Sequence, residues 1–342
     1  MTVVLGAAEI GAVIGAVDVV EAVEAIHADL GSGSMQQPAP VALTGSDDAL
    51  FLPMAVRSDR LGLVAVKLMA DIPYNADRGL PTQRSTILVS SSVTGECIAV
   101  LDGMAITRRR TAAASVVATR HLARPDSRTL GIIGAGNLAI EHARAFAATR
   151  PFERIVLWSR SSATIDRFLQ EVGGDLPGRC VIAAGPQEVV EESDVLCTLT
   201  PSVDPIVLGS WLHAGQHINA VGARPRPTHR ELDGQAMARA TVFVDSRATV
   251  LAKSGDLLEA VAEGALSAGA HYAELGEVIA GTAKGRTSAD EITVFDSVGL
   301  GAQDLAVAAR VIKLAQDRGI GTPVAVAPGS SAPFSTLAGA AS

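Results

Sequence analysis

The hydrophobic pattern divides the 342-residue chain into an N-terminal part of mixed periodicity and a central part in which strands and helices alternate. Apolar residues recur at helical spacing over residues 10–31, and Gly31 and Gly33 end this segment, so we expect one amphipathic core helix there. A helical pattern also covers residues 111–122. Between these helices, short apolar runs separated by Gly, Asp and Asn predict strands over residues 41–43, 50–54, 61–69, 85–90 and 97–101.

From residue 129 onward the pattern changes to a regular alternation with short connections. It predicts strands over 130–133, 155–158, 180–182, 195–199, 217–221 and 240–244, and helices over 137–149, 162–172 and 186–191. Such alternation is typical of an α/β fold with a mainly parallel, doubly wound sheet. A helix over 301–318 is expected to pack back on the first domain, and the Ala-, Pro-, Ser- and Gly-rich tail over 323–342 to be a mobile extension.

Composition narrows the class of protein. Hydrophobic residues make up 48% of the chain and charged residues 19%, which is typical of a globular protein. The net charge of −8 argues against a nucleic-acid-binding surface, and no apolar run reaches the length of a membrane-spanning helix. The apolar N-terminus lacks a basic region and carries Glu9, Asp18, Glu21 and Glu24, unlike a signal peptide. The three cysteines are widely spaced, without a metal-binding pattern. We therefore expect a cytoplasmic protein with no metal, membrane or nucleic-acid partner.

A glycine motif points to a dinucleotide. Gly134-x-Gly136-x-x-Ala139 follows an apolar strand and begins a helix. Gly134 permits a tight turn, Gly136 lets the backbone approach a pyrophosphate, and Ala139 allows close packing of helix on strand. The N–H groups at the helix start, where Asn137 and Leu138 lie, would hold the phosphates. An ordinary tight turn is the alternative, but the second strand that follows the helix favours a bound dinucleotide.

The end of that second strand bears on which cofactor binds. An NAD site usually has an acidic residue there, which accepts hydrogen bonds from the adenosine ribose. Here Ser159 and Arg160 follow the strand without an acid, so Arg160 can pair with a 2′-phosphate and NADP(H) is favoured over NAD(H). A solvated surface arginine is the alternative. We also expect Thr198, Thr200 and Val221, near the ends of the next two strands, to contact the cofactor.

One lysine stands out in the N-terminal part. Lys67 interrupts the apolar run over 61–69. A buried ammonium is costly unless it is paired, and its pKa is easily lowered toward neutral pH. A lysine at a strand edge, with its head in water, is the alternative.

Several motifs in a fixed order give a family resemblance. After Lys67 come Pro73-Tyr-Asn75, Gly79-Leu-Pro81-Thr82, Thr94-Gly95, Leu101-Asp-Gly103 and Thr107-x-x-Arg110-Thr111-Ala-Ala-Ala-Ser115, then the glycine motif, Ile218-Asn-Ala-Val-Gly-Ala223, Arg230-Glu-Leu-Asp233, Val244-Asp-Ser246, Ser254-Gly-Asp256, Ala273-Glu-Leu-Gly-Glu-Val-Ile279 and Asp296-Ser-Val-Gly299 with Asp304. This series resembles the ornithine cyclodeaminase/μ-crystallin family over roughly residues 35–310.

The resemblance implies a homodimer and two domains with different functions. Residues 1–112 and 305–342 would form an α+β substrate-binding and dimerisation domain, with a Rossmann-type dinucleotide-binding domain over 113–304 inserted between them. By position, Lys67 matches the family's catalytic lysine and Thr82 a substrate-contacting threonine. Arg110 matches the arginine that binds the substrate carboxylate. A guanidinium can grip a carboxylate through two parallel bonds, and a nearby lysine can exchange the nitrogen's proton as hydride moves. A structural arginine at a helix start is the alternative for Arg110.

The chain departs from the family at a second arginine. Many members bind the carboxylate also through an arginine in a Q-P-x-R segment, and Pro40 stands at that position here. Arg57, Arg60 and Arg84 are candidates to compensate.

A second departure concerns an acid. Cyclodeaminases use an aspartate shortly after the Ile218–Ala223 segment for ammonia loss, and its place falls here at Arg224 or Pro225. The segment is more similar to that of μ-crystallin, a ketimine reductase. His229 is a candidate titratable group, or simply a residue of an exposed turn.

Three functions remain open. The favoured one is an NAD(P)-dependent oxidoreductase that reduces a C=N bond in a cyclic ketimine or imino acid, or oxidises the matching amino acid. The second is an ammonia-lyase of the ornithine cyclodeaminase type, which uses NAD catalytically. The third is a non-catalytic binding protein that retains the cofactor site.

Overall fold

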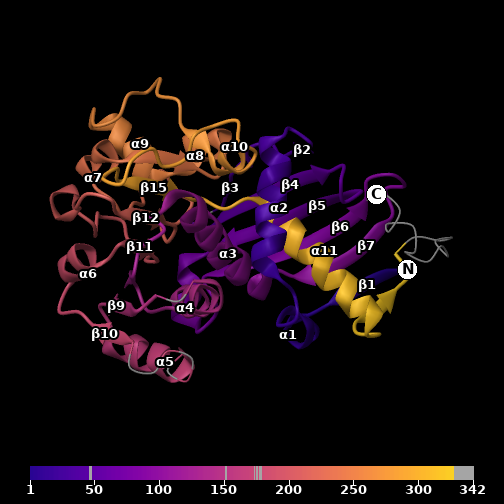
Figure 1. Ribbon diagram of the computed structural model, residues 1–342. Helices are drawn as coiled ribbons and strands as arrows, with labels where there is room; N and C mark the ends of the chain where they lie inside the picture. Colours follow the sequence, from indigo (N-terminus) through magenta and orange to yellow (C-terminus); the bar gives the residue numbers. More distant parts are fainter. Residues whose placement is uncertain (46–47, 151, 173, 175, 177–178, 327–342) are drawn as a thin grey trace. The chain divides into compact units, whose positions relative to one another are not determined.

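The computed structural model describes residues 1–45, 48–150, 152–172, 174, 176 and 179–326. These residues form two compact units. The first holds Met1–Arg110 together with the described residues from Leu300 on, and the second holds Thr111–Gly299. The predicted fold class is confirmed, because a parallel doubly wound sheet is inserted into the sequence of an α+β unit (Figure 1).

The first unit is built on one mixed sheet. Its strands are β1 (Thr2–Leu5), β2 (Met35–Gln36), β3 (Leu43–Thr44), β4 (Leu50–Ser58), β5 (Leu63–Asp71), β6 (Gln83–Ser91), β7 (Cys97–Asp102) and β16 (Thr322–Val324). Their order is β16-β1-β7-β6-β5-β4-β2, with β3 paired to β4. Strands β4 to β7 form an antiparallel meander, so alternate residues of each strand face opposite sides.

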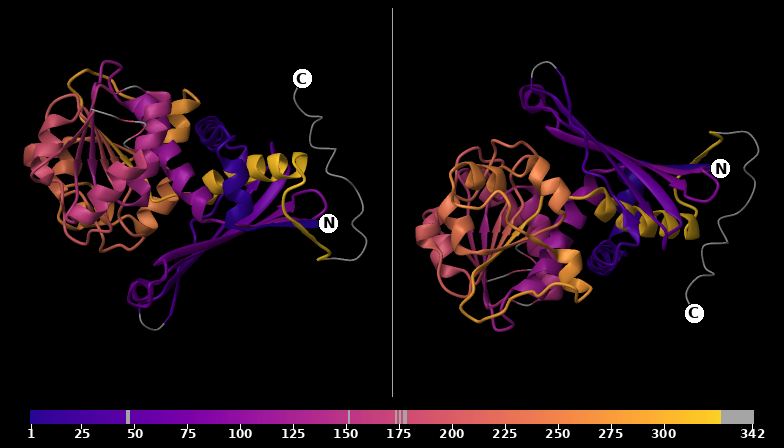
Figure 2. Two further views of the ribbon diagram at one scale, coloured as in Figure 1. Left: turned by 90° about the horizontal axis from the view of Figure 1, so that it is seen from below. Right: turned by 90° about the horizontal axis from the view of Figure 1, so that it is seen from above.

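Helices cover one side of this sheet. They are α1 (Ala7–Ile14), α2 (Val19–Gly31) and α11 (Gly301–Asp317), and Figure 2 shows α2 and α11 lying along one face. Leu63, Ala65 and Lys67 of β5 are buried on this face, whereas Val66 and Leu68 point to the other and are exposed. Within the described residues, no helix of this unit covers that other face. The pleat of β5 therefore sends Lys67 into the interior.

One expectation for the chain ends is wrong, and a second is wrong for residues 323 and 324. The helix expected over 10–31 is two helices, because the chain leaves the helical path after Ile14 and Asp18 starts α2 by accepting the N–H of Glu21 at 2.9 Å. Helical periodicity persists across the break and hides it. The tail is not wholly a mobile extension, because β16 pairs with β1, and residues 327–342 lie outside the described part.

The second unit is a parallel sheet with helices on its faces. Its strands are β8 (Thr129–Ile133), β9 (Arg154–Trp158), β10 (Cys180–Ile182), β11 (Val195–Thr198), β12 (His217–Ala220), β13 (Thr241–Val244), β14 (Ala273–Glu274) and β15 (Thr293–Asp296). The order is β10-β9-β8-β11-β12-β15-β13-β14. The helices are α4 (Asn137–Thr149), α5 (Ser162–Val172), α6 (Pro186–Glu192), α7 (Gly234–Arg239), α8 (Arg247–Lys253), α9 (Gly255–Ala262) and α10 (Leu275–Ile279). The strand order reverses between β8 and β11, and ligands of such sheets bind at the carboxyl ends of the strands at this point.

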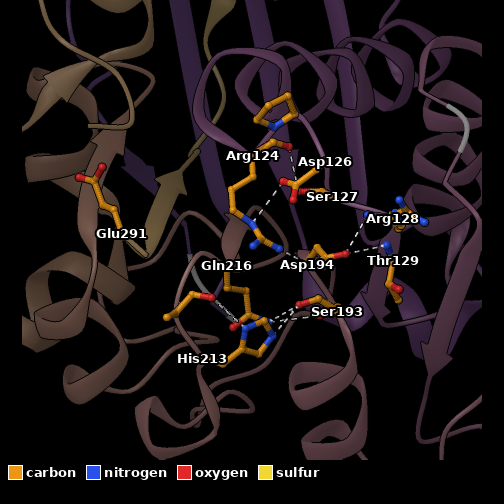
Figure 3. A network of polar contacts seen from close by, with 12 residues as sticks. Arg124, Asp126, Ser127, Arg128, Thr129, Ser193, Asp194, His213, Gln216 and Glu291 are labelled. Carbon is orange, nitrogen blue, oxygen red and sulfur yellow. Dashed lines mark hydrogen bonds and ion pairs between the residues drawn. The ribbon is translucent and has the colours of Figure 1, made fainter. Parts of the chain in front are cut away.

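A polar network closes the opposite, amino-terminal ends of β8 and β11 (Figure 3). Asp194, just before β11, accepts hydrogen bonds from Arg124 Nη2 at 2.8 Å and from the N–H groups of Arg128 and Thr129 at 2.7 and 3.0 Å. Burial raises the pKa of Asp194, but these donors outweigh it and lower the pKa below its ordinary value. The network therefore fixes the strand ends that lie away from the expected ligand site.

Three helical segments complete the element list: α3 (Met104–Leu122), which passes from the first unit into the second, and the short 3-10 helices Pro73–Arg78 and Gly209–Trp211. Among the described residues, no helix is long and apolar enough to cross a membrane.

Candidate active site

The first cluster of interest surrounds Lys67. Its side chain is only 2% exposed, and its neighbours across β4 and β6 are Met54 and Ile87, both buried. The Lys67 Nζ donates to Thr107 Oγ1 on α3 at 2.8 Å and to both carboxylate oxygens of Asp304 on α11 at 2.9 and 3.0 Å. Lys67 is therefore a buried, paired ammonium and not a lysine with its head in water.

The surroundings of Lys67 bring its pKa close to neutral pH. Burial is the largest effect and lowers the pKa of Lys67 to about 8, with Asp304 raising it and Arg110 lowering it. Burial alone would raise the pKa of Asp304, but the charges of Arg110 and Lys67 hold it below its ordinary value. The carboxylate therefore stays ionised while the ammonium is poised to release or regain a proton.

Arg110 enters the cluster from α3 and is also buried. Its Nε lies 3.4 Å from Asp304 Oδ1, and its Nη1 donates to Gln303 Oε1 at 2.8 Å. Among the described residues, Nη2 has no hydrogen-bond acceptor. The protein thus occupies Nε and one N–H of Nη1, and Nη2 and the second N–H of Nη1 are left to bind an anion.

Other residues predicted for this region lie outside these contacts. Thr82 is half-buried just before β6, and its carbonyl oxygen accepts the N–H of Ile72 at 2.8 Å. Arg57 pairs with Asp59 and Arg60 with Asp29, while Arg84 is exposed. The compensation expected from these three arginines is therefore not seen in the cluster.

The second cluster is a pocket of about 280 Å³ at the carboxyl ends of β8, β9 and β11. Gly134 has a φ of 102°, and a Cβ there would lie 2.7 Å from the Leu199 carbonyl oxygen, so only glycine fits this turn. Gly136 is the N-cap of α4, and a Cβ there would meet no atom within 4 Å. The helix start, where Asn137 and Leu138 follow, is therefore open to a pyrophosphate, and the residues fit a dinucleotide.

The ribose end of this pocket is polar and lacks an acid. Ser159, Arg160, Ser161 and Thr164 line it, with Ser159 Oγ 3.0 Å from Thr164 Oγ1. The exposed Arg160 is the charged residue of the lining. The pocket therefore offers a cation and hydroxyl groups where an NAD site usually offers a carboxylate.

Sequence reasoning missed Glu231, which is fully buried behind the pocket. Its carboxylate accepts four hydrogen bonds of 2.6–2.7 Å, from the Thr198 hydroxyl, the Thr200 hydroxyl and N–H, and the Gly222 N–H. Burial, followed by the charge of Asp256, raises the pKa of Glu231 to about 7. Glu231 thus joins the loops after β11 and β12 and fixes Thr200, which lines the pocket.

The sequence does carry a signal for Glu231, because this acid lies within the Arg230–Asp233 motif. Its partners come from segments that follow other strands, so the spacing alone gave no role. The predicted cofactor residue Thr198 is fully buried, with its hydroxyl donated to Glu231, and Val221 is half-buried beyond β12.

Comparison with known proteins agrees with this architecture. The family model described as "Ornithine cyclodeaminase/mu-crystallin family" matches residues 1–319. A Delta(1)-pyrroline-2-carboxylate reductase of Bacillus cereus is 36% identical over 277 residues, which are 81% of this chain and 84% of that protein. The ketimine reductase mu-crystallin of Rattus norvegicus is 35% identical over 82% of this chain and 85% of its own length.

A solved structure matches over nearly the whole chain. The Delta(1)-pyrroline-2-carboxylate reductase of Thermococcus litoralis, in complex with NADH and L-proline, superposes with a TM-score of 0.89 at 32% identity. The match covers 94% of this chain and all of that one. With a family model that spans both units and relatives that match most of the sequence, the chain belongs to the ornithine cyclodeaminase/mu-crystallin family.

Proposed function

We propose that the protein is an NAD(P)-dependent oxidoreductase that reduces the C=N bond of a carboxylate-bearing cyclic ketimine or imino acid, or oxidises the matching amino acid. The observation that carries this proposal is Lys67, a buried ammonium with a pKa of about 8 that is hydrogen-bonded to Asp304 and Thr107. The similarity to pyrroline-2-carboxylate and ketimine reductases supports it.

Each residue of the cluster has a task in this reaction. A nicotinamide cofactor supplies the hydride when it is bound. Arg110 binds the substrate carboxylate through its terminal nitrogens and so orients the C=N bond. Lys67 donates a proton to the substrate nitrogen, and Asp304 keeps the ammonium oriented and charged. Thr82 is proposed as a further substrate contact.

The lyase is disfavoured by the loop after β12. Ammonia loss needs a group that takes and gives protons at the leaving nitrogen, and Arg224 or Pro225 stands where cyclodeaminases have an aspartate. A guanidinium stays protonated at any working pH and cannot act as that base.

One experiment separates the functions. With 1-pyrroline-2-carboxylate and NADPH, we expect one NADPH oxidised for each proline formed, and with ornithine and catalytic NAD we expect no proline and no ammonia. Proline from ornithine would restore the lyase. Tight NADPH binding without turnover of either substrate would favour a non-catalytic role.

We further propose that NADP(H) is preferred. The 2′-phosphate would pair with Arg160, so NADPH should bind about 1–3 kcal/mol more tightly than NADH. Arg160→Ala should bring the two dissociation constants, measured by fluorescence titration, close together. Arg167→Ala, which removes an exposed arginine of α5 outside the pocket lining, should leave their ratio unchanged. A wild-type preference for NADH would contradict the proposal.

A homodimer is also proposed, and it is supported by the face of the first sheet that no described helix of the same unit covers. Val66, Leu68 and Leu88 are 38%, 46% and 42% exposed on neighbouring strands. Apolar side chains grouped on a flat sheet face favour association, because pairing two such faces removes them from water. The dimer implied by the family resemblance would use this face.

A further inference from the structure

A buried histidine lies behind the proposed substrate site and has no task in the chemistry described above. His27 is on α2 and is fully buried. Its Nε2 lies 3.0 Å from Nε2 of Gln303 in the first turn of α11. The same Gln303 holds Arg110, so a path of two hydrogen bonds leads from His27 to the guanidinium.

The direction of these hydrogen bonds follows from the donors present. Gln303 Oε1 accepts from Arg110 Nη1 at 2.8 Å and from the Leu300 N–H at 3.3 Å. The amide oxygen must therefore face these two donors, and its NH₂ group must face His27. His27 Nε2 is then the acceptor, which requires a neutral ring with its proton on Nδ1.

The surroundings keep this ring neutral. Burial is the main effect, and the charge of Arg110 the second, that lower the pKa of His27 to about 4. Within the described residues, Nδ1 has no hydrogen-bond partner. A buried donor without an acceptor costs stability, and native proteins rarely keep one without a reason. Here the reason is that Nδ1 must carry the proton if Nε2 is to accept the hydrogen bond from Gln303.

We propose that His27 is a positioning residue that acts through Gln303 to hold Arg110 in one orientation for the substrate carboxylate. The inference rests on the proposed function. Gln303 orients Nη1, and Asp304 lies against Nε. Together they fix the plane of the guanidinium, so its remaining N–H groups point in one direction. Without the amide in place, Arg110 could turn within the cluster and lose part of its fit to a planar anion.

Because the family's second arginine is absent here, the orientation of Arg110 matters more for substrate binding. Pro40 stands at that position, and the nearby Gln37 Oε1 instead accepts the Ala302 N–H at the start of α11. Arg110 is thus the single guanidinium of the described cluster. The substrate class that this favours has one carboxylate beside the C=N bond, bound end-on by one rigid arginine.

The test compares three variants. His27→Phe keeps a ring of similar shape but removes the acceptor, so the KM for 1-pyrroline-2-carboxylate and the Kd for L-proline in the presence of cofactor should each rise ~5-fold. The kcat should change less than twofold, and NADPH affinity should be unchanged. His27→Gln offers an amide oxygen near the position of Nε2 and should restore most of the affinity. Val23→Ala, one turn earlier on α2 and fully buried, should lower Tm without changing KM.

A double-mutant cycle tests the route through Gln303. If His27 acts only through this amide, His27→Phe should have no further effect on KM in a Gln303→Leu background. Additive effects would overturn the proposal, as would an unchanged KM in His27→Phe or an equal rise in Val23→Ala.

The readouts also separate this inference from the proposed function. If the wild-type protein binds L-proline but turns over no imine, the proposed reductase activity is wrong. The Kd values of the variants for L-proline then still test the role of His27. If the wild-type enzyme turns over the imine and His27→Phe leaves KM and Kd unchanged, only the inference about His27 is wrong. A wild-type protein that binds neither compound overturns both.

Discussion

Replacing Lys67 by Met is expected to lower kcat for imine reduction ~10³-fold, the usual contribution of a positioned general acid. Met is of similar length but has no proton to give. The fold should survive, because Asp304 keeps its contacts with Arg110 and with the Thr107 hydroxyl at 3.2 Å. Cofactor affinity should stay within about twofold of wild type, since the glycine motif belongs to the second unit.

Lys313→Met is the matched control, because that lysine is exposed on α11 and pairs with the exposed Asp317. Steady-state NADPH oxidation measures both variants. A Lys67→Met enzyme that keeps more than a tenth of the activity would show that Lys67 is not the proton donor.

The pH profile tests the same group in the wild-type enzyme. Lys67 donates only while it is protonated, so reduction should decline as the pH rises through about 8, and amino-acid oxidation should increase. Arg110 lowers the pKa of Lys67, so removing its charge should move this limb to higher pH.

Arg110→Lys is expected to lower kcat/KM for 1-pyrroline-2-carboxylate ~100-fold, equivalent to about 2.7 kcal/mol of transition-state binding. A lysine keeps the charge but not the planar pair of donors that matches a carboxylate. Most of the loss should appear in KM.

An imine without the acid group, such as 1-pyrroline, makes this test specific. The wild-type enzyme should strongly prefer the carboxylate-bearing imine, and Arg110→Lys should largely lose the preference. Arg108→Lys, in the same helix turn but in contact with Met104 Sδ, should behave as wild type. An Arg110→Lys enzyme with undiminished preference would contradict the role of Arg110.

The parallel sheet was the most predictable part of the fold, because buried strands and amphipathic helices differ in period and alternate at short intervals. Two strands of this sheet, β14 and β15, were not predicted, and the reason is plainest for β15. It has four residues, follows a polar stretch and lies between β12 and β13, so its place depends on neighbours far away in the chain. Long-range pairing of this kind leaves no local periodicity.

The site was predicted in part. Lys67 could be found because a charged residue is unusual in an apolar strand. Arg110 could be found because it lies in one of the family's motifs. The partners of both were not assigned, because Asp304 lies 237 residues from Lys67 and His27 lies 276 residues from Gln303. A buried histidine on a helix has the same spacing as any core residue, so only its neighbour reveals its role.

The return of α11 to the first sheet also sets an order of events during synthesis. At about 5–20 residues per second, a ribosome needs ~10–50 s to extend the chain from Lys67 to Asp304. The second unit is contiguous in sequence and can become native in that interval, whereas the first sheet waits for its last helix with an ammonium that has no carboxylate. Chains released before residue 304 would expose the apolar face of the first sheet that α11 covers, and chaperones and proteases act on such exposed apolar surface.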